Sequence, residues 1–202
     1  MRTILYLSAI VMFAGISVGA QDDEFVLMKG TANPSFVKSD NTGRCLVFGT
    51  HIVKTTTSDN GGENISLYAR EGTAKGLAAC RVRSEPYATF PSTDNNSFYG
   101  ISTDYFFIDT GTSVDSRTLL IYRTDSGDTV GSVGYYNDPT LVGGRYLVYD
   151  DLSSRKGSLA NCPEGAKWKR SGGGVGWVQG KKMDLQTKAT VNVGTLRCVY
   201  LE

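Results

Sequence analysis

Four cysteines constrain the fold of this chain more than any other feature of its sequence. They are Cys45, Cys80, Cys162 and Cys198, and the first two are 35 residues apart while the last two are 36 apart. None belongs to a Cys-x-x-Cys motif, so the sequence does not indicate zinc or redox chemistry. In an oxidising compartment four cysteines favour two disulfides, for which three pairings exist. The matched spacings favour Cys45–Cys80 with Cys162–Cys198, and closing each loop would stabilise the fold by roughly 3–4 kcal/mol.

The N-terminal segment predicts that oxidising compartment. Residues 1–20 begin with one basic residue, continue as an apolar run and end in the small residues Val18, Gly19 and Ala20. This pattern is typical of a secretory signal peptide, and the run is too short to span a membrane. We expect cleavage after Ala20 and a single mature domain over residues 21–202, soluble and either secreted or periplasmic. Two sequons, at Asn64 and Asn95, matter only in a host that glycosylates secreted proteins.

The mature chain has the pattern of short strands joined by turns. Runs rich in Val, Ile, Tyr, Phe and Thr are separated by Gly, Asn and Asp. Strands are expected near residues 44–48, 51–55, 65–70, 79–83, 105–109, 118–124, 129–136, 145–149 and 194–201. No stretch favours a helix of ten or more residues. We therefore predict an all-β antiparallel domain held by two disulfides.

Two internal similarities bear on its architecture. The run Tyr105–Asp109 is echoed by Tyr146–Asp150 at an offset of 41 residues, within the roughly 40–45 residues of a propeller blade. A second echo, of Ile65–Tyr68 by Leu119–Tyr122, has an offset of 54 residues. Because the two periods differ, two architectures remain open: a propeller-like fold of few blades, and a β-sandwich or barrel.

Composition narrows the function. With 40% hydrophobic and 20% charged residues and a net charge of +1, the chain is globular and is neither histone-like nor polyanionic. His51 is the only histidine, which excludes mechanisms that need two, and no GxSxG motif surrounds a serine. No cofactor or metal motif is recognised, so we expect neither. These observations favour a binding or interaction protein over an enzyme.

One short segment favours an enzyme instead. Residues 105–113 read Tyr-Phe-Phe-Ile-Asp-Thr-Gly-Thr-Ser and resemble the active-site signature of aspartic peptidases. The resemblance implies that Asp109 is a catalytic carboxylate in a turn formed by residues 110–112, with residues 141–143 as a downstream element. Because such chemistry needs two carboxylates sharing a proton, it implies a homodimer in which each chain contributes one Asp109. The other interpretation is a turn at the end of a strand, where Asp and Gly are favoured for their backbone properties.

The charges are unevenly distributed along the chain. Residues 21–154 carry 11 basic and 17 acidic residues, whereas residues 155–202 carry 9 basic and 3 acidic residues. The basic part includes both tryptophans and a glycine cluster, residues 172–176, that would let a partner approach the backbone closely. The candidate binding surface consists of Trp168, Lys169, Arg170, Trp177, Lys181 and Lys182.

Cations among aromatic rings suit an acidic protein or a polyanionic envelope component, and nucleic acid is not the expected partner. The opposite possibility is that the basic segment packs on the acidic remainder of the same domain. A third is a structural envelope or stress protein that has no dedicated ligand.

Overall fold

The computed structural model describes residues 26–59, 61–93, 95–113, 116–153 and 161–201. The predicted signal peptide and its cleavage site lie outside these residues. Within them, the chain forms three antiparallel sheets and two short helices, and no helix is long and apolar enough to cross a membrane. The predicted all-β antiparallel fold is confirmed.

Each sheet is a meander in which consecutive strands are neighbours. The first sheet contains β1 (Phe36–Asp40), β2 (Gly43–Val47), β3 (His51–Thr57), β4 (Glu63–Ala69) and β5 (Ala88–Phe90), with helix α1 (Leu77–Cys80) between the last two. The middle sheet contains β6 (Ser97–Ile101), β7 (Tyr105–Thr110), β8 (Arg117–Arg123) and β9 (Thr129–Tyr135). The third sheet contains β10 (Thr140–Val142), β11 (Tyr146–Leu152), β12 (Gly174–Asp184) and β13 (Thr190–Leu201), with helix α2 (Gly165–Arg170) before β12.

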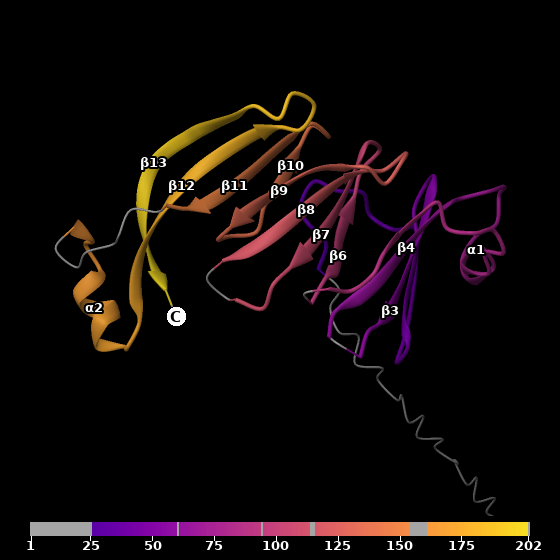
Figure 1. Ribbon diagram of the computed structural model, residues 1–202, viewed down its shortest axis with the longest axis horizontal. Coiled ribbons are helices and arrows are strands. Elements are labelled where there is room, and N and C mark those ends of the chain that lie inside the picture. Colours follow the sequence, from indigo (N-terminus) through magenta and orange to yellow (C-terminus); the bar gives the residue numbers. More distant parts are fainter. Residues whose placement is uncertain (1–25, 60, 94, 114–115, 154–160, 202) are drawn as a thin grey trace, which may run out of the picture.

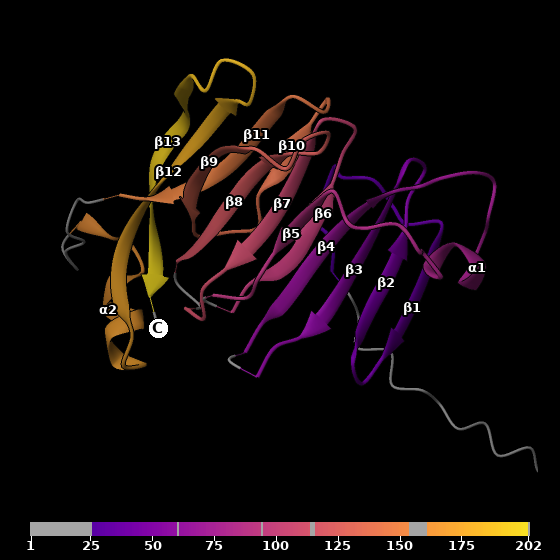
Figure 2. The same cartoon turned by 45° about the vertical axis from the view of Figure 1, so that its right-hand side comes forward.

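The sheets stand face to face in a row, with the middle sheet covered on both sides (Figures 1 and 2). This arrangement explains why Tyr105, Phe106, Phe107 and Ile108 form an unbroken apolar run, since successive strand residues face opposite sides and all four are buried. Phe106 and Ile108 pack towards the first sheet, and Tyr105 and Phe107 towards the third.

Aromatic rings hold the first interface together. The ring of Phe106 stacks on Phe98 at 5.4 Å and on Phe90 at 5.2 Å, while Phe48 meets Phe98 edge-on at 6.0 Å. Rings in such stacked and edge-to-face arrangements contribute about 0.5–1.5 kcal/mol per pair beyond their buried area.

The strand order explains the two internal echoes. Strands β7 and β11 are each the second strand of their sheets, and β4 and β8 are each the third if the extra edge strand β1 is set aside. The offsets differ because the connection from β4 to β5, which contains α1, is longer than the turn from β8 to β9. The sheets follow one another as propeller blades do and pack face to face as in a sandwich. The first and third sheets lie at opposite ends of the row (Figure 1).

Both disulfides are present with the pairing that the spacing favoured. Cys45 of β2 is bonded to Cys80 of α1, and Cys162 to Cys198 of β13. The strand expected at residues 79–83 is wrong, because Ala79 and Cys80 belong to α1. This segment covers the outer face of the first sheet, where Cys80 reaches Cys45 and Ala79 packs near Ile52, so it cannot extend the sheet in its own plane.

Five strands were not expected, namely β1, β5, β6, β10 and β12. The most important is β12, whose glycines obscure the strand pattern. A Cβ atom on Gly176 would lie 2.9 Å from the Leu201 side chain, and one on Gly180 would lie 2.6 Å from the Val193 carbonyl oxygen. Glycine at these positions therefore lets β12 lie close to β13.

Burial of both faces of the middle sheet can be tested by paired truncations on β7. The side chains of Phe106 and Phe107 point to opposite faces of the middle sheet. Phe106→Ala and Phe107→Ala should each lower the free energy of unfolding by about 3–5 kcal/mol. On a strand with one solvent face, one of the two would cost little. Val37→Ala, at a side chain that is 43% exposed, is the control and should cost less than about 1 kcal/mol. Chemical denaturation measures all three, and a small loss for either phenylalanine would contradict the arrangement.

Candidate binding site

Both tryptophans of the chain lie at one end of the third sheet, where α2 packs beside β12. Trp168 comes from α2 and Trp177 from β12. Cys198 is the cross-strand neighbour of Trp177, and its disulfide to Cys162 ties the segment that leads into α2 to this point of the sheet. The disulfide therefore fixes where the two indoles lie relative to each other.

A cavity of about 530 Å³ opens between these elements. It is lined by Cys162, Pro163, Glu164, Trp168, Trp177, Leu196, Arg197 and Cys198. We call it the tryptophan pocket. Its volume is within the range of small-molecule sites. Apart from Glu164 and Arg197 its lining is apolar, so it suits an aliphatic or aromatic group with charged groups beside it.

The indole of Trp168 packs against a tyrosine ring of β13. It is half-buried and meets the ring of Tyr200 edge-on, with 6.1 Å between centroids. Backbone N–H groups of Ser171 and Gly173 donate to the backbone carbonyl oxygen of Trp168, which fixes the end of α2. The tryptophan side chain is thus positioned by the helix and by β13 and still lines the pocket.

The structure brings only some of the predicted surface together. Arg170 follows Trp168 on α2 and is exposed, whereas the side chain of Lys169 lies outside the described residues. Lys181 and Lys182 are neighbours on β12, so they point to opposite faces of the third sheet. The six residues therefore do not form one continuous surface.

The two lysines also have contacts of their own. The ammonium of Lys181 donates to the side-chain oxygen of Asn192 at 2.8 Å, and that of Lys182 lies 4.1 Å from the centre of the Tyr146 ring. Neither contact removes charge, because asparagine and tyrosine are neutral partners here.

The positive charge of the C-terminal part is not neutralised by the rest of the described fold. Residues 161–201 contain 7 basic and 2 acidic residues, a net charge of +5. Two ion pairs cross to earlier residues, Arg197 with Asp150 and Asp184 with Arg145. Asp150 adds one negative charge and Arg145 adds one positive charge, so the two pairs together leave the net charge unchanged. No ion pair within the described ranges involves Arg170, Lys181, Lys182 or Lys188.

The glycine cluster does not face an outside partner at every position. A Cβ atom on Gly173 would lie 1.8 Å from the ring of Tyr200, and Gly176 is close to Leu201. The close approach that these glycines permit is to β13 of the same sheet.

Asp109 lies elsewhere, in the interior of the middle sheet. It is the residue before the end of β7, is only 3% exposed, and pairs with Ser97 on one side and Leu119 on the other. The hydroxyl of Tyr135 donates to its Oδ1 at 2.6 Å, and Arg117 bonds to the same oxygen through Nε at 3.1 Å and to Oδ2 through an ion pair. Burial raises the pKa of the Asp109 carboxyl, and Tyr135 and Arg117 oppose that rise.

These contacts leave little room for peptidase chemistry. Catalysis would require a second carboxylate and a water at Asp109, yet both of its oxygens already accept hydrogen bonds or an ion pair. The adjacent cavity, about 230 Å³, is lined by two guanidinium groups, those of Arg44 and Arg117, each paired with a carboxylate of the same chain. Gly111, with φ of 105°, provides the turn after β7. The arrangement favours the interpretation of Asp109 as a structural residue near a strand end.

The contacts of His51 are with residues outside the tryptophan pocket and the surroundings of Asp109. It lies on β3, where its Nδ1 is 2.7 Å from the hydroxyl of Thr50 and its ring meets Tyr87 edge-on. Burial lowers its pKa. No contact joins it to Asp109 or to either tryptophan among the described residues.

Sequence reasoning missed several residues of the tryptophan pocket, namely Pro163, Glu164, Leu196 and Arg197. A signal was available, because each lies within two residues of Cys162 or Cys198, and a disulfide necessarily brings its flanking residues together. A scan against family models and searches of curated proteins and of solved structures found no match for this chain. The pocket is therefore interpreted from its own geometry and charge.

The role of Arg117 beside Asp109 gives a pH-dependent prediction. Arg117→Ala leaves an ionised, buried carboxylate with fewer donors and should lower the free energy of unfolding by about 2 kcal/mol at neutral pH. Because the raised pKa of Asp109 means that its protonated form favours the folded state, this loss should shrink as the pH falls and the carboxyl is neutralised.

Denaturant titrations at neutral and acid pH measure this effect. Lys38→Ala, which removes the exposed ion pair with Asp40, serves as the size control and should cost less than about 1 kcal/mol. A loss for Arg117→Ala that stays constant or grows in acid would show that the carboxylate does not depend on this guanidinium.

Proposed function

We propose that this protein is an extracellular, non-enzymatic binding protein that recognises an acidic protein partner through the tryptophan pocket. The observation that carries the proposal is that both tryptophans line one largely apolar cavity within a part of the chain whose net charge of +5 stays unneutralised. A partner's apolar side chain would enter between the indoles, while its acidic groups would face the basic residues.

The charge distribution selects among partners. Aromatic and arginine residues in a desolvated pocket are typical anchors of protein interfaces, and complementary charge around them accelerates association. A polyanionic polymer of sugars or phosphates would use the charge but brings no apolar side chain to fill the cavity. An acidic protein uses both, so it is the partner we infer.

Two features support an extracellular location. The first 20 residues have the pattern of a signal peptide, and the chain has two disulfides with no free cysteine among the described residues. Cleavage of the chain after Ala20 and secretion of residues 21–202 are part of the proposal.

Intrinsic fluorescence tests the proposal directly, because the only two tryptophans of the chain line the pocket. We expect a short peptide of glutamates around a central phenylalanine to shift or quench the emission. A peptide with lysines in place of the glutamates, and one with alanine in place of phenylalanine, should bind more weakly. Arg170→Glu should weaken binding of the acidic peptide about fivefold at low salt, and the difference should fade as salt is added.

Lys75→Glu is the matched control, since Lys75 is also exposed and basic but lies in the connection that contains α1 at the other end of the row of sheets. It should leave binding unchanged. Equal responses to acidic and basic peptides, or equal effects of the two charge reversals, would refute the proposal. Absence of any response would favour a structural protein that has no dedicated ligand.

The enzymatic alternative makes a different prediction at Asp109. Under a peptidase mechanism, Asp109→Asn would abolish hydrolysis of peptides at acid pH. We expect instead no hydrolysis by the wild-type protein, and a loss of thermal stability in Asp109→Asn because the charged partner of Arg117 is removed. Cleavage by the wild type that disappears in the variant would establish the enzyme.

A further inference from the structure

A second cavity, separate from the tryptophan pocket, lies where turns of the middle and third sheets converge. Residues 102–104 join β6 to β7, residues 143–145 join β10 to β11, and residues 185–189 join β12 to β13. The cavity between them measures about 440 Å³ and is lined by Ser102, Thr103, Asp104, Gly143, Gly144, Arg145 and Gln186. We call it the turn pocket. Every lining residue is polar or glycine, in contrast to the apolar tryptophan pocket.

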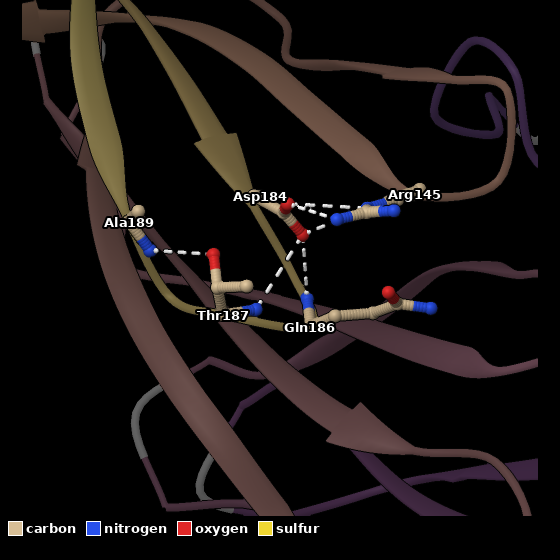
Figure 3. A network of polar contacts seen from close by, with 5 residues as sticks. All are labelled: Arg145, Asp184, Gln186, Thr187 and Ala189. Carbon is tan, nitrogen blue, oxygen red and sulfur yellow. Dashed lines mark hydrogen bonds and ion pairs between the residues drawn. The ribbon is translucent and has the colours of Figure 1, made fainter.

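The arginine of the turn pocket is rigidly held. Arg145 donates from Nε to both oxygens of Asp184, at 3.0 and 3.1 Å, and from Nη2 to Oδ2 at 2.5 Å. Asp184 in turn accepts the backbone N–H of Gln186 at 3.0 Å and that of Thr187 at 3.5 Å, and Ala189 donates its N–H to the hydroxyl of Thr187 (Figure 3). This network positions the guanidinium before any ligand binds, and its Nη1 has no partner among the described residues.

Other hydrogen-bonding groups in the turn pocket are also unused. The carboxylate of Asp104, the hydroxyl of Thr103 and the side-chain amide of Gln186 are exposed, and none has a side-chain hydrogen bond or ion pair within the described part of the chain. Figure 3 shows the amide of Gln186 and the guanidinium of Arg145 on the same side of Asp184. The pocket therefore offers donors and acceptors side by side.

Two glycines leave one wall of the turn pocket without side chains. Gly143 and Gly144 have φ of 60° and 69°, the left-handed conformation that glycine adopts most readily. A Cβ atom on either would meet nothing within 4 Å, so the space beside them is open. A ligand could approach this backbone closely.

The charges in and around the turn pocket decide the class of ligand. The charge of Arg145 is balanced by Asp184. Arg123, whose charge interacts with Asp104 through space, is paired with Asp125 at 3.4 Å. Asp104 is left as an additional carboxylate, which disfavours anions. A simple cation would leave the Nη1 donor of Arg145 without an acceptor. A hydroxyl group fits both, because it donates to a carboxylate and accepts from a guanidinium or an amide.

We propose that the turn pocket is a carbohydrate-binding site, in which adjacent hydroxyl groups of a neutral sugar bond to Asp104, Arg145 and Gln186. Its exposed side chains suit a sugar at the end or on the side of a glycan chain. The site does not depend on the proposed role of the tryptophan pocket.

Amide chemical shifts measured by NMR test the proposal on the full mature chain. The probes are glucose, mannose, galactose and N-acetylglucosamine, with the methyl glycoside and the disaccharide of each, at about 10 mM because weak sites bind in the millimolar range. At least one sugar should shift the amides of Gly143, Gly144 and Gln186 and leave those near Trp177 unchanged. Glutamate, which has a net negative charge, and putrescine, a dication, should not shift them.

Variants separate a built site from nonspecific contact. Asp104→Ala and Gln186→Ala remove exposed side chains that make no hydrogen bond or ion pair with other described residues, so both should fold, and each should weaken the sugar response about tenfold or more. Arg170→Glu, at the tryptophan pocket, should leave the response intact, so that failure here and failure of the acidic-peptide test are independent results. No shift with any sugar, shifts with glutamate or putrescine alone, or a sugar response unchanged in Asp104→Ala would each overturn the proposal.

Discussion

Burial of the middle sheet on both faces is the constraint on which the other parts of the structure depend. A sheet covered on both sides must present apolar residues at successive positions, and β7 and β8 do so with residues such as Phe106, Phe107, Leu119 and Leu120. The first and third sheets each have one face fixed by this contact. Their remaining surfaces are where the helices and disulfides occur, since α1 covers the first sheet and α2 packs beside the third.

The same constraint determines where polar chemistry can occur. Ionised groups inside the row must be paired, as Asp109 is with Arg117 and as Glu63 is with Arg44. Exposed side chains with unused hydrogen-bonding capacity, such as Asp104 and Gln186, are instead found at the turns between strands. The two candidate pockets are therefore at the turn edge and at the free end of the third sheet, and neither requires a change in the core.

The sequence predicted features that depend on local pattern and missed those that depend on long-range contacts. Most strands and both disulfide pairs were predicted, because strand periodicity and cysteine spacing are visible along the chain. The strand β12 was missed because Gly176 and Gly180 weaken its pattern, and the reason for these glycines, the closeness of β13, is a tertiary contact. Asp109 was predicted in a turn, yet Tyr135, 26 residues away in the sequence, makes it a buried hydrogen-bonded group. The pockets could not be predicted in full, since each combines residues from segments that only the fold brings together.

The net charge of the chain, only +1, conceals an uneven distribution of charge along the sequence. If the basic C-terminal part had packed on the acidic remainder, many ion pairs would join them, but among the described residues only Arg197–Asp150 and Arg145–Asp184 do so, and both lie within the third sheet. Sheet stacking explains this, because the third sheet meets the middle sheet through apolar side chains and leaves its lysines on the surface. Fields from such exposed charges extend about 8–10 Å at physiological salt. The surplus of basic groups in residues 161–201 therefore attracts acidic molecules over this distance.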